Sequence, residues 1–163
     1  MKLKGVDLGK PYVETIVIPR GQGVIVLEAQ AVLDYDAFFA LCPVPTPPSA
    51  MRRDKATGTI VEYKDVEDQK YTAMIMDWST KKVAWMVIQS LKATPELEWD
   101  TVVDGDPETW KNYETELKEA NFSAREIDRI IEGVTTSCGL NEDKIKEATQ
   151  SFLAGRVQAE SET

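Results

Sequence analysis

The hydrophobic pattern divides the chain into a β-like first third and a helical remainder. Two runs rich in β-branched residues, 12–18 and 23–32, are separated by the turn-forming spacer 19–23. Two such runs joined by a short loop that contains glycine are typical of a β-hairpin. The run 59–63 predicts a third strand, so we expect residues 12–64 to be rich in β-structure.

A short helix and a proline-rich stretch interrupt the β-like region. Residues 34–41 favour a helix with Asp34 as its N-cap, because a short polar side chain can accept a hydrogen bond from a free N–H of the first turn. Four prolines follow within residues 43–48, and proline has a fixed φ and no N–H. We expect this stretch to be an extended surface connector, with a ligand for an aromatic groove as the alternative.

From residue 68 onward, apolar residues recur at helical spacing. They predict either one long helix or two helices that break near residues 77–79. Asp106 as N-cap and Pro107 at the first helical position predict the start of the next helix, and Asn121 predicts its left-handed end. The recurring positions of the first helical region are Tyr71, Met74, Ile75, Trp78, Trp85, Ile88 and Leu91.

Two more helices are predicted towards the C-terminus. Ser123 and Glu126 have the spacing of a capping box, in which each side chain satisfies a backbone N–H of the other residue. That helix is expected to end at Gly139, and a last helix to run from Asn141 towards Leu153. Residues 156–163 are polar and lack an apolar period, which predicts a flexible tail.

Together these elements predict an α+β fold. An N-terminal β-hairpin or small antiparallel sheet is followed by a mainly α-helical C-terminal two-thirds. The length of 163 residues suits one domain, which we expect to span residues 1–155. Within it, residues 12–64 are β-rich, 43–48 form the connector and 68–155 are helical. A chain of this size can bury enough surface to fold without a metal or a disulfide.

Charge narrows the range of partners. Asp and Glu outnumber Lys and Arg by 28 to 19, which leaves a net charge of −9. Binding to a phosphate backbone or an anionic membrane needs several cations on one face, and the basic spots 51–55 and 81–82 are short. We therefore expect neither nucleic acid nor membrane as a partner. No signal peptide or long apolar run is found, which predicts a cytoplasmic protein with reduced thiols.

Residues that carry out catalysis are scarce. The chain has no histidine, which removes the most common general base and metal ligand. Cys42 and Cys138 are far apart and are interpreted as structural thiols. Carboxylates surround Gly105, but Val102 and Lys111 stand where a calcium loop needs ligands. We therefore predict a protein that is not an enzyme, with no catalytic residue, no cofactor and no metal site.

Four tryptophans lie within one stretch of the sequence. Trp78 and Trp85 share a helical face, and Trp99 and Trp110 flank the aspartate-rich turn. Large aromatic side chains are most often core residues, but they are also favoured anchors of protein interfaces. We predict that these four residues form a partner-binding surface.

The order of features along the chain resembles one known family. A β-rich start leads into an Asp-Tyr-Asp-x-Phe helix, the proline-rich run 42–48 and a tryptophan-rich helix that ends at residues 88–91. The segments that continue the resemblance are 97–102, 107–110, 116–117, 123–127 and 140–153. Over residues 12–153 this layout is similar to the small tail assembly chaperones of long-tailed bacteriophages.

The resemblance implies a specific function. Such chaperones bind the long, helical, apolar tape measure protein in the host cytoplasm and keep it soluble until the tail tube forms around it. Many copies would be needed to coat that client, which implies self-association. The alternative is a structural subunit of the phage particle, a head–tail connector or tail terminator, located in the virion tail or neck. An acidic decoy of nucleic acid is a further alternative.

Overall fold

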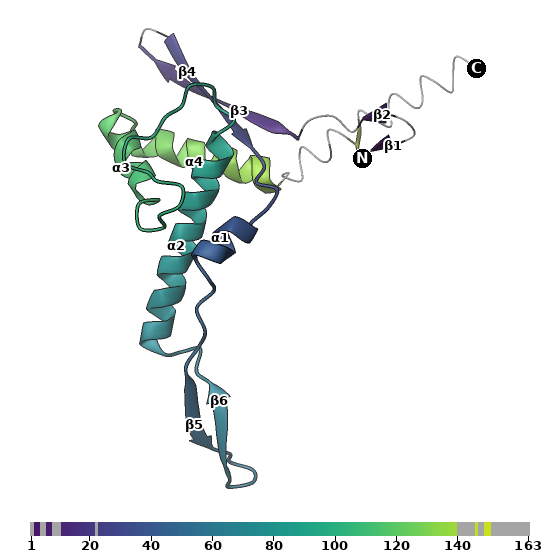
Figure 1. Cartoon of the computed structure of the whole chain (residues 1–163), viewed down its shortest axis with the longest axis vertical. Helices are drawn as coiled ribbons and strands as arrows, with labels where there is room; N and C mark the ends of the chain where they lie inside the picture. Colours follow the sequence, from purple (N-terminus) through teal and green to yellow (C-terminus); the bar gives the residue numbers. More distant parts are fainter. Residues whose placement is uncertain are drawn as a thin grey trace, which may run out of the picture. The chain divides into compact units, whose positions relative to one another are not determined.

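The computed structural model describes residues 2–3, 6–7, 11–21, 23–139, 146 and 149–150 (Figure 1). In this part of the chain, four helices accompany three two-stranded antiparallel sheets, which confirms the predicted α+β class. The first sheet is short and pairs β1 (Lys2–Leu3) with β2 (Val6–Asp7). None of the described helices has the length and apolarity that crossing a membrane requires.

The predicted N-terminal hairpin is present. Strand β3 (Val13–Arg20) pairs with β4 (Gly23–Gln30) along their whole lengths. The expected spacer 19–23 is shorter than predicted, because Pro19 is a strand residue opposite Val24. A two-stranded sheet consists of edge strands only, so it can accept a proline without losing an interior ladder bond.

The described chain forms two compact units, each built from segments that are separated in the sequence. The first contains β3, β4, Ser90–Leu97 and α4 (Ala124–Gly139), and the second contains Leu33–Gln89 and Glu98–Phe122. Helix α2 (Gln69–Leu91) is continuous and contributes its last two residues to the first unit. The expectation of a single domain over residues 1–155 therefore stays a prediction.

In the first unit, one face of the β3–β4 hairpin packs on α4 (Figure 1). The approach is close at Gly133 of α4, where an added Cβ would lie 2.5 Å from the side chain of Ile16. Two buried hydroxyls are satisfied: Ser90 donates to the carbonyl of Gln30 at 2.7 Å, and Ser137 donates to that of Val134 at 2.8 Å. The buried apolar residues of the hairpin and the helix are Ile16, Ile18, Leu27, Ala29, Ile127, Ile130 and Val134.

Helix α4 begins as the sequence predicts. The N–H of Ser123 donates to Glu126 Oε2 at 2.7 Å, and the N–H of Glu126 donates to Ser123 Oγ at 3.4 Å, which confirms the capping box. Asn121, just before it, has a φ of 61°, the left-handed conformation predicted for a helix end.

In the second unit, α1 spans Asp36–Leu41 rather than 34–41. Tyr35 occupies the N-cap position, and Asp34 precedes it in the sequence. The Oδ1 atom of Asp34 accepts the N–H of Asp36 at 2.7 Å. Helix α2 is one uninterrupted helix, which confirms the first of the two predicted alternatives and not the one with a break near residues 77–79. Asp68 caps α2 by accepting the N–H of Tyr71 at 2.8 Å.

The helix predicted to start at Asp106 and Pro107 begins later, since α3 spans Asn112–Glu119. Residues 107–111 form turns instead. The Thr109 hydroxyl donates to the carbonyl of Asp106 at 2.8 Å and accepts the N–H of Val103 at 2.9 Å. These local bonds compete with helix formation, which explains why the cap signal is followed by turns.

A second hairpin was only half predicted. Strand β6 (Ile60–Lys64) corresponds to the predicted strand 59–63, and it pairs with β5 (Ser49–Arg53), which the sequence did not indicate. The connector 43–48 contains no helix or strand, as expected. The predicted last helix lies mostly outside the described residues, although residues 146, 149 and 150 are helical. The predicted tail 156–163 also lies outside them.

Candidate interaction site

An aromatic cluster holds the second unit together. Its centre is Phe38 of α1, which is fully buried. The ring of Phe38 lies 5.5 Å from that of Trp78, 5.7 Å from that of Trp85 and 5.9 Å from that of Trp110, measured between centroids. Tilted and edge-on contacts at these distances are the favoured geometry of aromatic pairs. One short helix is thereby fixed to α2 and to the segment that contains Trp110.

Two of the predicted anchors are core residues of this cluster. Trp110 is 0% exposed, Trp85 is 5% exposed, and their rings lie 6.5 Å apart. The indole N–H of Trp110 donates to the carbonyls of Val103 and Asp104, both at 3.1 Å. A buried indole with its donor satisfied stabilises the fold, so these two tryptophans support a surface that other residues present.

Three aromatic residues and a lysine form what we call the aromatic surface: Tyr35, Phe39, Trp78 and Lys82. Phe39 is 40% exposed and stacks on Trp78 with 6.3 Å between ring centroids. The ammonium of Lys82 lies 5.3 Å, 5.9 Å and 5.5 Å from the ring centroids of Tyr35, Phe39 and Trp78. Met74, one helical turn before Trp78, is 54% exposed and extends the surface along α2.

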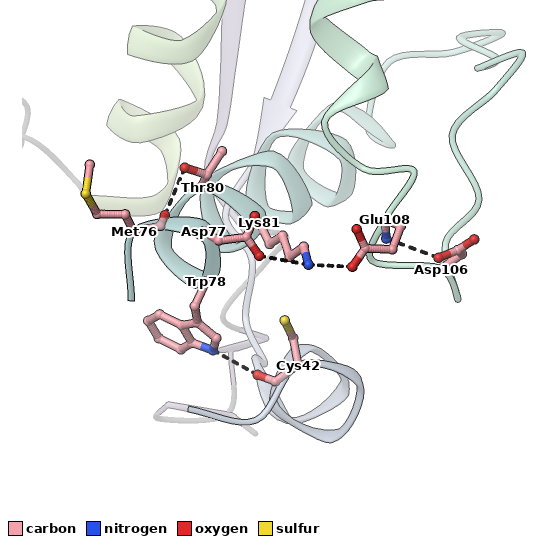
Figure 2. Close-up of polar contacts among 8 residues, drawn as sticks. All are labelled: Cys42, Met76, Asp77, Trp78, Thr80, Lys81, Asp106 and Glu108. Carbon is pink, nitrogen blue, oxygen red and sulfur yellow. Dashed lines mark hydrogen bonds and ion pairs between the residues drawn. The ribbon is translucent and has the colours of Figure 1, made fainter. Parts of the chain in front are cut away.

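A side-chain hydrogen bond within the aromatic surface joins α2 to the end of α1. The indole N–H of Trp78 donates to the carbonyl of Cys42 at 2.9 Å, as Figure 2 shows. This bond fixes the chain just after α1, where the proline-rich connector begins. Burial raises the pKa of the Cys42 thiol although Lys81 opposes the shift, so the reactive thiolate is disfavoured near neutral pH.

A lysine clamp fixes the neighbouring segment. The Lys81 ammonium contacts Glu108 Oε1 at 2.6 Å and Asp77 Oδ2 at 2.9 Å (Figure 2). The hydrogen bond to Glu108, followed by that to Asp77, raises the pKa of Lys81 well above its usual range. The side chain of Lys81 is mostly buried, whereas that of Glu108 is exposed. The clamp therefore joins α2 to the loop before α3 through a permanently charged lysine.

Glu116 of α3 fixes the start of the same loop. Its carboxylate accepts the N–H of Asp100 at 2.8 Å, the N–H of Thr101 at 2.7 Å and the hydroxyl of Thr101 at 2.6 Å. Burial alone would raise the pKa of Glu116, but the hydrogen bonds from Thr101 and the backbone outweigh it and lower the pKa. Trp99 in this loop is half-buried and makes none of the ring contacts of the cluster.

Sequence reasoning identified part of this site. Of the four predicted tryptophans, the structure brings together Trp78, Trp85 and Trp110, and only Trp78 contributes to the aromatic surface. The sequence analysis did not assign Phe38 and Phe39 to the site, because a helix of six residues is too short to show a period. The closely spaced aromatic residues after Asp34 were the available signal.

Carboxylates among the described residues take part in local hydrogen bonds, whereas the aromatic surface is open to a partner. Among them, no group of three or more Cys, Asp or Glu residues is placed to hold a metal ion. The carboxylate of Asp106, near Gly105, instead accepts the N–H of Glu108 at 3.1 Å. A partly exposed aromatic surface with one cation can bind an apolar or aromatic segment of another protein.

Comparison with known proteins gives no relative. No family model, no curated protein and no solved structure matches this chain.

Proposed function

We propose that this protein is a tail assembly chaperone of a long-tailed bacteriophage. It binds the tape measure protein in the host cytoplasm and keeps it soluble during tail assembly. The observation that carries the proposal is the aromatic surface on α1 and α2, taken together with the resemblance of residues 12–153 to that family. The protein acts through contact surfaces and not as an enzyme.

The aromatic surface suits a long helical client. Met74 and Trp78 lie one turn apart on α2, and Phe39 stacks beside Trp78, which gives an apolar stripe along the helix. An apolar face of a client helix can pack against such a stripe through side chains spaced three and four residues apart. Because Phe38 contacts the rings of Phe39 and Trp78, and Trp85 contacts that of Tyr35, little side-chain entropy is lost on binding.

The charge of the chain supports the same role. A chaperone that covers apolar segments must keep the complex dispersed, and a net charge of −9 gives repulsion between coated clients. The Lys82 ammonium above the rings can also pair with a carboxylate of the client and thereby orient it.

The experiment is capture of the tape measure protein on co-expression. The wild-type chain is expected to move that protein from the aggregated to the soluble fraction. The double variant Phe39→Ala/Met74→Ala should lose at least about 10-fold in capture, because hot-spot residues each contribute more than about 1 kcal/mol. Met76→Ala is the matched control: Met76 is an exposed methionine of the same helix, two residues from Met74. Equal capture by all three proteins would exclude the aromatic surface as the client site.

The alternative is a structural subunit of the particle, located in the virion tail or neck. It is favoured by the β5–β6 hairpin, which is exposed on both faces in the manner of an arm that interlocks subunits. A mass-spectrometric inventory of purified virions decides between the two. A chaperone is expected to be absent from the particle, whereas a connector or terminator would be present at the stoichiometry of a ring.

A further inference from the structure

The β5–β6 hairpin is an arm whose two strands pair mainly with each other. Within the described residues of the second unit, no other helix or strand is packed along it (Figure 1). Met51 is 70% exposed and Ile60 is 74% exposed, although they lie on the same face of the pair. A two-stranded hairpin with both faces in water is at best marginally stable. Its exposed apolar side chains and open edges are therefore available to a partner.

The arm carries the opposite charge to the rest of the chain. Its residues include four cations, Arg52, Arg53, Lys55 and Lys64, against the carboxylates of Asp54 and Glu62. The whole chain, in contrast, has a net charge of −9. Arg52, Arg53 and Lys55 line a hollow of about 420 Å³ together with Asp54 and Val61. The three cations that line this hollow make it suited to an acidic side chain of a partner.

Internal contacts give the arm a defined shape before it binds. The guanidinium of Arg52 lies 5.0 Å from the ring centroid of Tyr63 on the paired strand. Arg53 Nε donates to the carbonyl of Gly58 at 2.9 Å, and Asp54 Oδ1 accepts the N–H of Ala56 at 2.8 Å in the loop. A surface ordered in advance loses less entropy on association.

We propose that the arm binds the acidic surface of a second copy of this chain. The receiving surface is the acidic segment 98–108, which has five carboxylates, of which Glu108 is paired with Lys81, and the exposed Val103. Opposite charges would steer the arm onto this segment, while Met51, Ile60 and Val103 supply apolar contact. Because the arm and the segment are different surfaces, the contact is heterologous, so it produces rings or open arrays of copies.

Charge favours this partner over nucleic acid. A polyanion drawn to Arg52 and Arg53 would be repelled by the remainder of a chain with a net charge of −9. A second copy of the chain carries the same negative charge, and that charge attracts the basic arm. The proposal does not depend on the tape measure protein, because the arm and the aromatic surface consist of different residues.

The test is a charge swap followed by sedimentation velocity. The arm variant Arg52→Glu/Arg53→Glu and the segment variant Glu98→Lys/Asp100→Lys should each lose self-association by at least about 10-fold. An equimolar mixture of the two variants should recover it, since each altered surface then meets a complementary one. Association of the wild-type chain should weaken as salt is raised from about 50 mM to about 500 mM.

A matched control separates local from general charge effects. Lys70→Glu/Arg125→Glu changes the net charge by the same amount as the arm variant, at two exposed positions outside the arm. It should associate as the wild type does. Circular dichroism of every variant checks that the fold is retained.

Three results would overturn the proposal. One is a wild-type chain that stays monomeric up to about 100 μM, a concentration at which even micromolar contacts form. Another is a segment variant that still self-associates, which would indicate arm-to-arm pairing. The third is an arm variant that self-associates normally but no longer captures the tape measure protein, which would make the arm a client site.

Discussion

The two longer hairpins, β3–β4 and β5–β6, have the same local architecture and opposite environments. Both β3–β4 and β5–β6 are antiparallel pairs with continuous register. The first buries Ile16, Ile18 and Leu27 against α4, whereas the second exposes Met51 and Ile60. A hairpin alone gains little stability from its own ladder, so packing against a helix decides which of the two contributes to the core. The hairpin that lacks such packing remains accessible to partners.

The largest expected effect comes from truncating matched isoleucines in the two hairpins. Ile18→Ala in β3 should reduce the free energy of unfolding by about 2 to 5 kcal/mol, because Ile18 is fully buried and its removal leaves a cavity. Ile60→Ala in β6 should change it by less than about 0.5 kcal/mol, because Ile60 is exposed. Denaturant unfolding followed by circular dichroism measures both. Equal losses would refute the contrast.

A smaller effect is expected where β3 approaches α4. Gly133→Ala places a Cβ 2.5 Å from Ile16, and such overpacking costs about 1 to 3 kcal/mol. The higher helix propensity of alanine offsets about 1 kcal/mol of that loss. The variant is therefore expected to be less stable than the wild type in the same unfolding assay.

Two further variants test the cause of that loss. Ile16→Ala removes both Cγ1 and Cδ1, the two atoms that would lie 2.5 Å from the added Cβ, so the double variant with Gly133→Ala should lose less than the sum of the two single losses. Gly105→Ala serves as a control, since nothing lies within 4 Å of its added Cβ. Strict additivity would show that Gly133 is not a close-packing position.

Acid should destabilise the contact between the β3–β4 hairpin and α4. Hydrogen bonds from the N–H and hydroxyl of Ser123, together with the charge of Arg20, lower the pKa of Glu126. The ionised Glu126 also pairs with Arg20 of β3 at 3.3 Å. A carboxylate with a lowered folded-state pKa contributes stability above its unfolded value, near 4.5, and loses it as the pH falls through the folded value. Below about pH 4.5, hydrogen exchange in β3 and α4 should therefore accelerate.

The variant Glu126→Gln isolates this effect. Glutamine keeps the capping geometry but does not titrate, so the local dependence on acid should disappear. The strands β5 and β6 belong to the other compact unit, and their exchange serves as an internal reference. If β3 and α4 of the variant respond to acid as in the wild type, another group is responsible.

The smallest effect concerns the arm. Arg52→Ala removes the cation–π contact with Tyr63, which at an exposed site contributes about 0.5 to 1 kcal/mol. Hydrogen exchange of the amides of β5 and β6 should accelerate, while that of β3 and β4 should not change. Accelerated exchange in both hairpins would show that they unfold as one unit.

The sequence alone determined most of the local structure. It predicted β3 and β4 from two β-branched runs, α2 from helical spacing, and the start of α4 from Ser123 and Glu126. These signals are local, because caps and periods act within a few residues. The cap signal at Asp106 was wrong about the helix that follows it, since Thr109 forms competing side-chain bonds with Val103 and Asp106.

Only the tertiary structure decided which aromatic residues are covered. Trp78, Trp85 and Trp110 have equal weight in the sequence, yet packing around Phe38 buries two of them and leaves Trp78 beside the exposed Phe39. Tertiary structure also decided that β5 pairs with β6 and that, within the described part of the second unit, no helix covers the pair. Burial depends on contacts between residues far apart in the chain, and a single sequence contains no local signal for them.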